Sequence, residues 1–353
     1  MIRHHARLLR VALLAALAAT APLTLACGTQ SASGPPKWDS RSVGESIKRA
    51  PFTPVIVNSN IGRGPTRLAL ALLRQDQTLV IEGQVTAEVY RIDNEPEKNP
   101  ATGTVVGTYN MVIHVIDTAD HSTMRFDRDD GAHVTRDVAL RDDTTPDERA
   151  LPAHDGAMSA IFTTMIDFKE AGMYGARLQV KTGGKTVRNL LLTFAVLERT
   201  AEPSVGDPAP RTKQKIAKDV SDLSELDSSA KPNPSLHDIT VADAIDSGKP
   251  ALVAFVTPAF CQTRFCGPVL NNVIIPAQQQ YQGRVHVIHI EPYDLVAARK
   301  GTLTAVPAAV EWNLRAEPFI AVIDGQGRVS AKFEGIIDLD EVKQALDAAL
   351  AAR

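Results

Sequence analysis

The chain has 353 residues, of which 44% are hydrophobic and 22% are charged, a composition typical of globular proteins and long enough for two domains. Its formal net charge is −3, and only 5% of its residues are aromatic. Because nucleic-acid binding draws on basic surfaces and stacking aromatics, these values argue against nucleic acid as a partner.

The N-terminal 26 residues have the pattern of a targeting segment. Three arginines precede an apolar run of 16 residues, VALLAALAATAPLTLA, which is shorter than the ~20 residues that a membrane span needs. We therefore expect residues 1–26 to be a signal peptide. The sequence LTLAC at residues 23–27 resembles the lipobox of bacterial lipoproteins, which implies lipidation of Cys27 and anchoring to the cell membrane. A plain secretory signal is the alternative.

The next segments are expected to be a tether and an all-β domain. Residues 27–50 are rich in Ser, Gly and Pro and predict a flexible tether. Residues 51–198 contain short apolar runs separated by Gly, Pro, Asn and Asp, which predict a β-sandwich with an acidic loop at 118–156. The run AGMYGARLQV resembles the strand before the last in immunoglobulin-like domains, where a tyrosine packs a corner; Tyr174 would be that residue. The TGG at residues 182–184 predicts the turn into the last strand.

The second half of the chain changes pattern. Residues 199–235 carry Pro, Ser, Lys and Asp with little periodicity and are expected to be a linker. From residue 236 to 353, strands and helices are expected to alternate. A hairpin turns at residues 324–327, and DLDEVKQALDAALAAR predicts a closing helix with Asp338 and Glu341 in a capping-box pattern.

Two of the three cysteines, Cys261 and Cys266, lie in FCQTRFCGPV, after a buried strand and at the start of a helix. If both lay in regular helix, their rise alone would be ~7.5 Å, beyond the ~7 Å Cα separation that a disulfide allows. We therefore expect Cys261 in the preceding loop and Cys266 at or near the first turn. Cys261 should be the more exposed and is the candidate nucleophile, with Cys266 as resolving cysteine. A helix N-terminus favours thiolate, and Arg264 could add to that effect.

The order of strand, cysteine motif, helix, strand, hairpin and helix resembles the thioredoxin fold, particularly that of TlpA-type reductases. The VGDPAP at residues 205–210 and the VIDGQGRV hairpin add to this resemblance. It implies thiol–disulfide exchange, with a cis-proline at Pro318 beside the active site. The expected fold is thus an immunoglobulin-like β-sandwich followed by an α/β thioredoxin-like domain.

Three other functions stay open on the sequence. TPAFCQTRFCG is similar to the site of bacterioferritin-comigratory peroxiredoxins, although Thr257 is out of register and Pro318 occupies the position of their arginine. SCO-like copper chaperones share the fold and a cysteine pair, but theirs has three intervening residues. The pair could also be a structural disulfide in a non-catalytic binding lipoprotein.

Histidine placement gives no metal-binding pattern. His286 and His289 lie three apart on one predicted strand and therefore point to opposite faces, and His237 precedes the first helix of the second domain. We expect no cofactor and no metal. The expected protein is an extracytoplasmic, lipid-anchored thiol–disulfide oxidoreductase whose partners are protein thiols and disulfides outside the cytoplasm.

Overall fold

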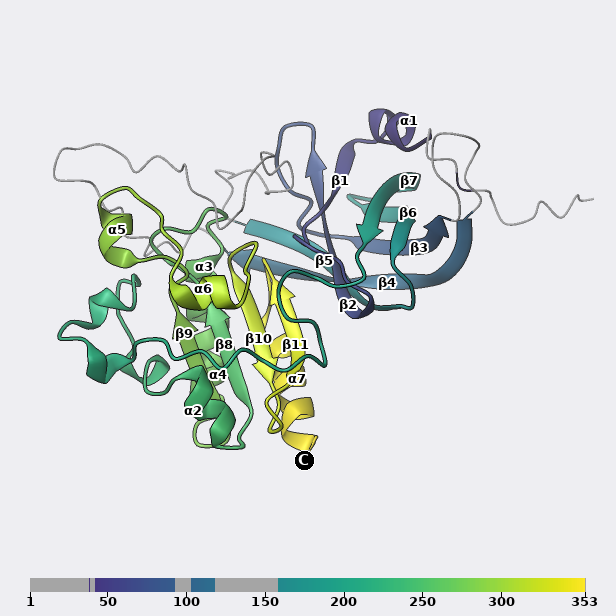
Figure 1. Cartoon of the computed structure of the whole chain (residues 1–353). Helices are drawn as coiled ribbons and strands as arrows, with labels where there is room; N and C mark the ends of the chain where they lie inside the picture. Colours follow the sequence, from purple (N-terminus) through teal and green to yellow (C-terminus); the bar gives the residue numbers. More distant parts are fainter. Residues whose placement is uncertain (1–37, 39–41, 93–102, 118–157, 353) are drawn as a thin grey trace, which may run out of the picture. The chain divides into compact units, whose positions relative to one another are not determined.

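Figure 1 shows the computed structural model, which describes residues 38, 42–92, 103–117 and 158–352. All of the described residues belong to one compact unit. The expected signal peptide, Cys27 and the acidic loop at 118–156 lie outside the described residues. Within the described ranges, no helix is long and apolar enough to cross a membrane.

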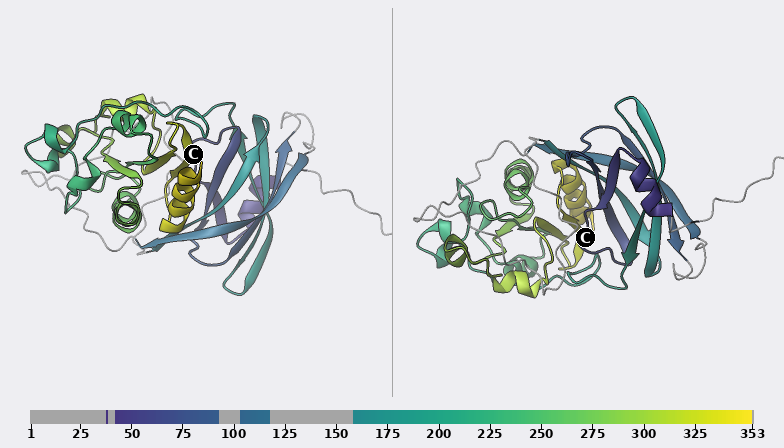
Figure 2. Two further views of the ribbon diagram at one scale, coloured as in Figure 1. Left: turned by 90° about the horizontal axis from the view of Figure 1, so that it is seen from below. Right: turned by 90° about the horizontal axis from the view of Figure 1, so that it is seen from above.

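The first half of the unit is a seven-stranded antiparallel sheet in the order β1-β2-β5-β4-β3-β6-β7. The edge strands β1 and β7 also contact each other, so the sheet is nearly closed into a barrel (Figure 2). Its strands are β1 (Phe52–Ile56), β2 (Gly64–Arg74), β3 (Gln84–Ile92), β4 (Gly103–Asp117), β5 (Met158–Phe168), β6 (Gly172–Thr182) and β7 (Lys185–Val196).

This sheet differs from the expected sandwich, in which two separate sheets would face each other. The cause is the long strand β4, which pairs with β3 up to Met111 and with β5 from Val112 onward. One strand therefore joins what would otherwise be two sheets into one continuous, curved sheet. The apolar interior includes large side chains from several strands: Leu68, Leu70, Leu72, Phe162, Phe168 and Phe194.

Strand β2 is buried on both faces. Leu68, Leu70 and Leu72 belong to the barrel core, whereas Ala69 and Ala71 belong to the core cluster of the α/β region. Side chains alternate across a strand, so a strand covered on both sides carries an unbroken apolar run. This explains why the sequence here reads LALALL rather than alternating apolar and polar residues.

Tyr174 forms the corner that the sequence predicts. Its hydroxyl donates a hydrogen bond to the backbone carbonyl of Glu170 at 2.8 Å, and its ring contacts Phe168 and Phe194 at centroid distances of 5.0 and 6.0 Å. The expected turn into β7 is also present, with Gly183 and Gly184 at φ values of 53° and 71°. These positive values favour glycine, which lacks a Cβ.

The segment expected to be a flexible tether is partly ordered. Residues Ser42–Arg49 form helix α1, and Trp38 is fully buried against Tyr90 at a ring-centroid distance of 5.6 Å. The hydroxyl of Ser46 accepts a hydrogen bond from the backbone of Leu191 in β7. The segment is mostly polar, but it contains Trp38, and the burial of this large side chain against Tyr90 holds the segment on the sheet.

The expected linker at 199–235 is likewise packed rather than extended between domains. The Glu202 carboxylate is buried and pairs with Lys332 at 2.9 Å. Asp227 and Ser228 are also buried, and short 3₁₀ turns occur at Ala217–Asp219, Leu223–Glu225 and Pro234–Leu236. Polar side chains here make specific hydrogen bonds, which their composition alone does not reveal.

The α/β region follows the order that the thioredoxin resemblance implies. Its four-stranded sheet has the order β11-β10-β8-β9, with β8 and β9 parallel and β10 antiparallel to both β8 and β11. The elements are α2 (Val241–Asp246), β8 (Ala251–Phe255), α3 (Cys266–Val269), α4 (Ile275–Gln280), β9 (His286–Ile290), α5 (Leu295–Arg299), α6 (Pro307–Glu311), β10 (Phe319–Ile323), β11 (Val329–Glu334) and α7 (Leu339–Ala351).

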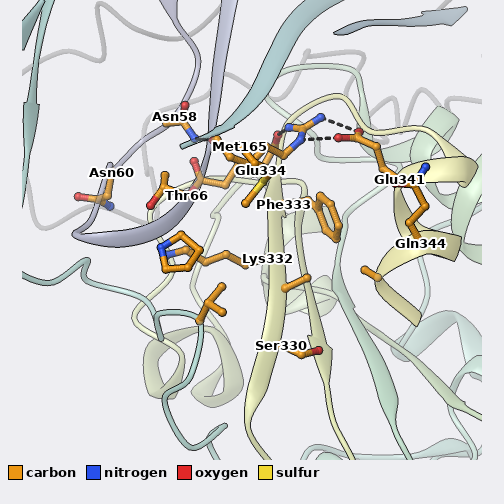
Figure 3. Close-up of a pocket in the computed structure, with 15 residues that line it drawn as sticks. Asn58, Asn60, Thr66, Met165, Ser330, Lys332, Phe333, Glu334, Glu341 and Gln344 are labelled. Carbon is orange, nitrogen blue, oxygen red and sulfur yellow. Dashed lines mark hydrogen bonds and ion pairs between the residues drawn. The ribbon is translucent and has the colours of Figure 1, made fainter. Parts of the chain in front are cut away.

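A largely buried ion pair, with Arg67 6% and Glu341 19% exposed, connects β2 to helix α7 (Figure 3). Arg67 donates to both carboxylate oxygens of Glu341 at 2.8 and 2.7 Å and also to the carbonyl of Ile336. Asp338 caps α7 as predicted, because its side chain accepts from the backbone N–H of Glu341. The pair lines a cavity of about 320 Å³ that also includes Phe333.

Candidate redox site

The cysteine pair lies where its spacing predicts. Cys261 is in the loop after β8, and Cys266 is the first residue of α3. Both cysteines are free thiols in this structure. The exposed fraction is 8% for Cys261 and 0% for Cys266, so Cys261 is the more accessible, as expected. Arg264, between them, has a φ of 64°, in the left-handed region that turns the chain back toward the helix.

The helix that begins at Cys266 is not a regular α-helix. A π-helical turn over Leu270–Ile274 separates α3 from α4. Pro276 lies in the first turn of α4, and its missing N–H cannot make an ordinary helical hydrogen bond. The sequence predicts a cut or kink at Pro276, and the wider turn is the local adjustment that accommodates it.

Two groups beside the loop contact the Cys261 sulfur. The backbone N–H of Cys266 donates to the Cys261 sulfur at 3.2 Å, and the Thr263 hydroxyl lies 3.3 Å from it. The first N–H groups of a helix have no partner within the helix, so a sulfur placed there satisfies one of them. A thiolate accepts such hydrogen bonds better than a thiol, and the loop therefore favours the ionised form of Cys261.

The two thiols differ strongly in acidity. Burial by itself raises the pKa of Cys261, but hydrogen bonds from the Cys266 thiol, from Thr263 and from the Cys266 backbone outweigh it and lower the pKa to about 6. Burial raises the pKa of Cys266 well above its usual value, and the hydrogen bond to Cys261 and the charges of Cys261 and Glu317 add to that effect. At neutral pH, one cysteine is thus mostly thiolate and the other is a thiol.

A buried carboxyl lies directly beside the pair. Glu317 accepts a hydrogen bond from the backbone N–H of Gln262 at 3.0 Å and is 5% exposed. The Tyr293 hydroxyl, 3.5 Å away, donates to its other oxygen. Burial raises the pKa of Glu317 to about 8, and the charge of Cys261 contributes to the increase.

Pro318 has the expected cis peptide bond, which joins it to Glu317. The Thr263 hydroxyl reaches the carbonyl of Glu317 at 3.4 Å, so the cysteine loop and the proline segment are neighbours. Glu317 itself was not predicted from the sequence. The only signal was an acidic residue directly before the expected cis-proline, and its burial depends on the fold.

Other residues singled out in the sequence lie elsewhere. The Arg264 side chain is exposed, and the groups that lower the pKa of Cys261 are hydrogen-bond donors other than Arg264. The hydroxyl at Cys261 belongs to Thr263 rather than Thr257. His286 is half-buried and contacts Ser247, whereas His289 is fully buried, so the two do point to opposite faces.

Two clusters of potential metal ligands exist within the described residues, and neither includes a cysteine. One consists of Asp227, His237 and His289, all buried. The other consists of His114, Asp338 and Glu341, beside the ion pair of Arg67. A copper chaperone of the SCO type would require a histidine beside the cysteine pair. Among the described residues, no cluster of three or more potential ligands includes the thiols.

Comparison with known proteins gives one partial likeness. The sequence matches no protein-family model, and no curated protein matches it. A thioredoxin-family thiol:disulfide interchange protein from Chlorobium tepidum TLS is similar in structure, with 16% sequence identity and a TM-score of 0.23. The likeness covers 32% of this chain and 86% of that protein.

Proposed function

We propose that this protein is a thiol–disulfide oxidoreductase that exchanges disulfides with protein partners through Cys261 and Cys266. The observation that supports this most directly is the asymmetry of the pair. A Cys261 sulfur with a pKa of about 6 lies within hydrogen-bond distance of the Cys266 backbone, while the Cys266 thiol stays protonated and fully buried. Attack by one thiolate followed by resolution by a second thiol needs this arrangement.

The proposed reaction has two steps. The Cys261 thiolate attacks one sulfur of a partner disulfide, so that a mixed disulfide forms and the other partner sulfur leaves as a thiolate that takes up a proton. Cys266 then loses its proton and attacks the Cys261 sulfur, which forms the Cys261–Cys266 disulfide and releases the second partner thiol. The partner gains the two electrons that the pair loses, together with two protons, one from the Cys266 thiol and one from solvent; the reverse sequence oxidises a dithiol partner.

Glu317 is the proposed proton acceptor for the second step. Its carboxyl has a pKa of about 8, and the negative charge of its carboxylate helps to raise the pKa of Cys266. Loss of the Cys261 negative charge in the mixed disulfide removes one cause of that raised pKa. Glu317 can then release its proton to the departing partner thiolate, and the resulting carboxylate can accept the proton of Cys266 when that thiol attacks the mixed disulfide.

Trapping of the mixed disulfide tests the two roles. Cys266→Ser should accumulate an adduct on Cys261 when the full chain is treated with glutathione disulfide, because the resolving thiol is absent. Cys261→Ser is the matched variant, and its remaining thiol, Cys266, should form an adduct much more slowly. Mass spectrometry of tryptic peptides locates the modified residue. An adduct that forms equally fast on Cys266 in the Cys261→Ser protein would contradict the assignment.

The reduction potential separates an exchanging pair from a structural one. Equilibration of the full chain with glutathione buffers should give a value above about −300 mV, since lower values characterise structural disulfides. A value below about −300 mV would identify a structural disulfide in a non-catalytic binding protein. Peroxidase activity has a separate readout: rapid conversion of Cys261 to a sulfenic acid by stoichiometric peroxide would favour that alternative instead.

We also propose that the protein acts outside the cytoplasm, anchored by a lipid on Cys27. The support is the arginine-led apolar segment and the LTLAC sequence at residues 23–27. An oxidising compartment is also where a closely spaced cysteine pair would cycle through a disulfide. Mass spectrometry of the mature N-terminus should find a lipidated Cys27, and cleavage at another position would refute the anchor.

A further inference from the structure

A second cluster of chemically active side chains does not include the cysteines and has no part in the proposed exchange. It consists of Asp227, His237, which precedes α2, and His289 on β9. All three are at most 3% exposed. One potential ligand atom from each lies within 4.8 Å of the others. Three buried side chains of this kind, from three separate segments, converge on one point.

The hydrogen bonds of His289 leave one ring nitrogen available. Its Nε2 lies 3.0 Å from the carbonyl of Val256, to which it donates a proton. Its Nδ1 has no hydrogen-bond partner among the described residues, although it is fully buried. A neutral histidine fixed in this way presents the Nδ1 lone pair to the cluster. Metal-bound histidines typically donate their other ring N–H to a carbonyl or carboxylate in this manner.

The spacing of the cluster is longer than that of a well-formed hydrogen bond and suits a bound ion. His237 Nε2 and His289 Nδ1 lie 3.4 and 3.7 Å from the same oxygen of Asp227, Oδ2. Good N–H···O bonds are ~2.9 Å long. In a tetrahedral zinc site with bonds of ~2.0–2.2 Å, neighbouring ligand atoms are about 3.3–3.6 Å apart. We propose that Asp227, His237 and His289 form a binding site for a divalent transition metal ion of the Zn²⁺ type.

The Asp227 carboxylate is already oriented for this role. Its Oδ1 accepts a hydrogen bond from the backbone N–H of Ser229 at 2.8 Å, and the N–H of Asn233 lies 3.2 Å from Oδ2. Backbone donors of this kind hold a ligating carboxylate in place and keep it ionised. Imidazole and carboxylate together form a donor set suited to zinc.

In the other candidate cluster, His114, Asp338 and Glu341, the histidine already has hydrogen-bond partners at both ring nitrogens. His114 uses both ring nitrogens, with Asp338 at 2.6 Å and Thr163 at 2.7 Å. Arg67 already pairs with Glu341 in the same place. Those distances are hydrogen bonds, and the cationic guanidinium disfavours a second cation. The contrast supports a ligand role for the His289 cluster alone.

The proposed site has room for a fourth ligand. His237 and His289 both line a cavity of about 490 Å³, together with Glu291 and Tyr293. Three protein ligands leave one tetrahedral position, which a water or small molecule in the cavity can fill. An open position of this kind is a property of exchangeable or catalytic metal sites, in contrast to closed structural ones.

The rival explanation is a buried ion pair without a metal. Burial opposes the charged form of His289, but Asp227 raises its pKa to about 9, so a proton competes with a metal for Nδ1. Zinc binding must therefore displace that proton. The amount of zinc that the protein retains distinguishes the metal site from the ion pair. The proposed metal site does not depend on the exchange activity of the cysteines.

The experiment uses the full chain with both thiols replaced, Cys261→Ser/Cys266→Ser, so that sulfur cannot bind the probe. Zinc ions alone are the probe, added at micromolar concentration and followed by exhaustive dialysis and elemental analysis. We expect one zinc per chain. Cobalt substitution should give the visible bands of a tetrahedral nitrogen–oxygen site. Zinc far below one per chain would overturn the proposal and leave the ion pair as the explanation.

Three variants in that background assign the ligands. His289→Gln keeps a donor for Val256 but removes Nδ1, and His237→Asn removes the second imidazole; each should lose the retained zinc and the cobalt bands. His286→Gln, on the same strand but outside the cluster, should retain both. Thermal melting curves recorded in the presence of a chelator establish that each variant folds. If His289→Gln does not fold, His237→Asn alone tests the assignment. Undiminished zinc in a folded His237→Asn or His289→Gln protein would overturn the assignment.

Discussion

The backbone N–H of Cys266 lies 3.2 Å from the Cys261 sulfur and donates to it, so one cysteine of the pair stabilises the thiolate of the other. This contact depends on the four intervening residues. They form a loop that turns back through Arg264, at positive φ, and returns the Cys261 sulfur to the start of the helix. A pair with wider spacing than that of thioredoxin thus still places its first sulfur against an unpaired helix N–H.

The pH dependence of alkylation tests this contact. Iodoacetamide should modify Cys261 with a rate that rises through a midpoint near pH 6, because the pKa of its thiol is lowered to about 6. Thr263→Val removes a hydroxyl 3.3 Å from the sulfur and should move the midpoint to higher pH. Thr263→Ser retains the hydroxyl and should restore the wild-type profile. The rates are measured by mass spectrometry of the Cys261 peptide.

An unchanged midpoint in Thr263→Val would show that the hydroxyl does not stabilise the thiolate. Cys266 supplies an internal reference in the same experiment, since burial and its neighbours raise the pKa of its thiol well above the usual value. Its modification should remain slow across the same pH range. Equal modification of both cysteines at pH 7 would contradict the asymmetry on which the proposed function rests.

The raised pKa of Glu317 predicts a pH-dependent stability. The folded protein keeps a proton on Glu317 up to about pH 8, whereas the unfolded chain releases it near its usual value of 4.5. The unfolded state therefore binds fewer protons between these pH values, and stability falls as pH rises through this window. Glu317→Gln should flatten that part of the curve. Urea unfolding of the reduced protein at intervals from pH 5 to 8 measures the difference.

The matched control is Glu198→Gln, which removes an exposed carboxylate whose partner, Arg63, is also on the surface. It should leave the slope of stability against pH as in the wild type. The same Glu317→Gln protein should resolve mixed disulfides with a changed pH profile, because its proton acceptor is gone. Identical slopes for wild type and Glu317→Gln would show that Glu317 does not retain its proton on folding.

The cysteine arrangement could be predicted from the sequence because it follows from chain geometry. Five residues of helical rise exceed the reach of a disulfide, which requires a loop before Cys266 whatever the remaining fold. The turn at Gly183 and Gly184 and the cap at Asp338 were also predicted, since each depends on local residue types, whereas the cis-proline at Pro318 was implied by the thioredoxin resemblance.

The remaining features depend on long-range packing, which leaves no local pattern. Glu317 resembles any surface glutamate until the fold buries it beside Cys261. Trp38 is a large apolar residue in a polar segment, and its contact with Tyr90 helps to order that segment. The change of partner along β4 is invisible because each half has an ordinary strand pattern, so the sequence predicts a sandwich where the strands form one sheet.

Glu341 should contribute strongly to the stability of the folded unit. It pairs with Arg67, whose side chain is 6% exposed, and its replacement by Ala removes the carboxylate that pairs with this cation. Removal of one partner from a buried pair costs about 3 kcal/mol or more of the free energy of unfolding. Asp340→Ala, on the same helix, removes an exposed partner of Lys343 and should cost no more than about 1 kcal/mol. Urea unfolding of both variants gives the comparison, and similar losses would contradict the assigned burial.

The contact between Trp38 and β6 gives the last prediction. A Cβ atom on Gly175 would lie 2.4 Å from the Trp38 ring, so Gly175→Ala should destabilise the protein by about 1–3 kcal/mol through overpacking. Gly44→Ala, in α1, meets no atom within 4 Å and should instead stabilise the helix by about 0.5–1 kcal/mol.

A double-mutant cycle makes the test specific to Trp38. In a Trp38→Ala background, the cavity left by the indole ring can accept the new methyl group, so Gly175→Ala should then cost little. Trp38→Ala alone should cost about 3–5 kcal/mol, because a fully buried aromatic side chain is lost. The free energies of unfolding of the two single variants and the double variant give the coupling. Additive losses would mean that residue 38 does not pack on Gly175, and that the segment before α1 is a mobile tether after all.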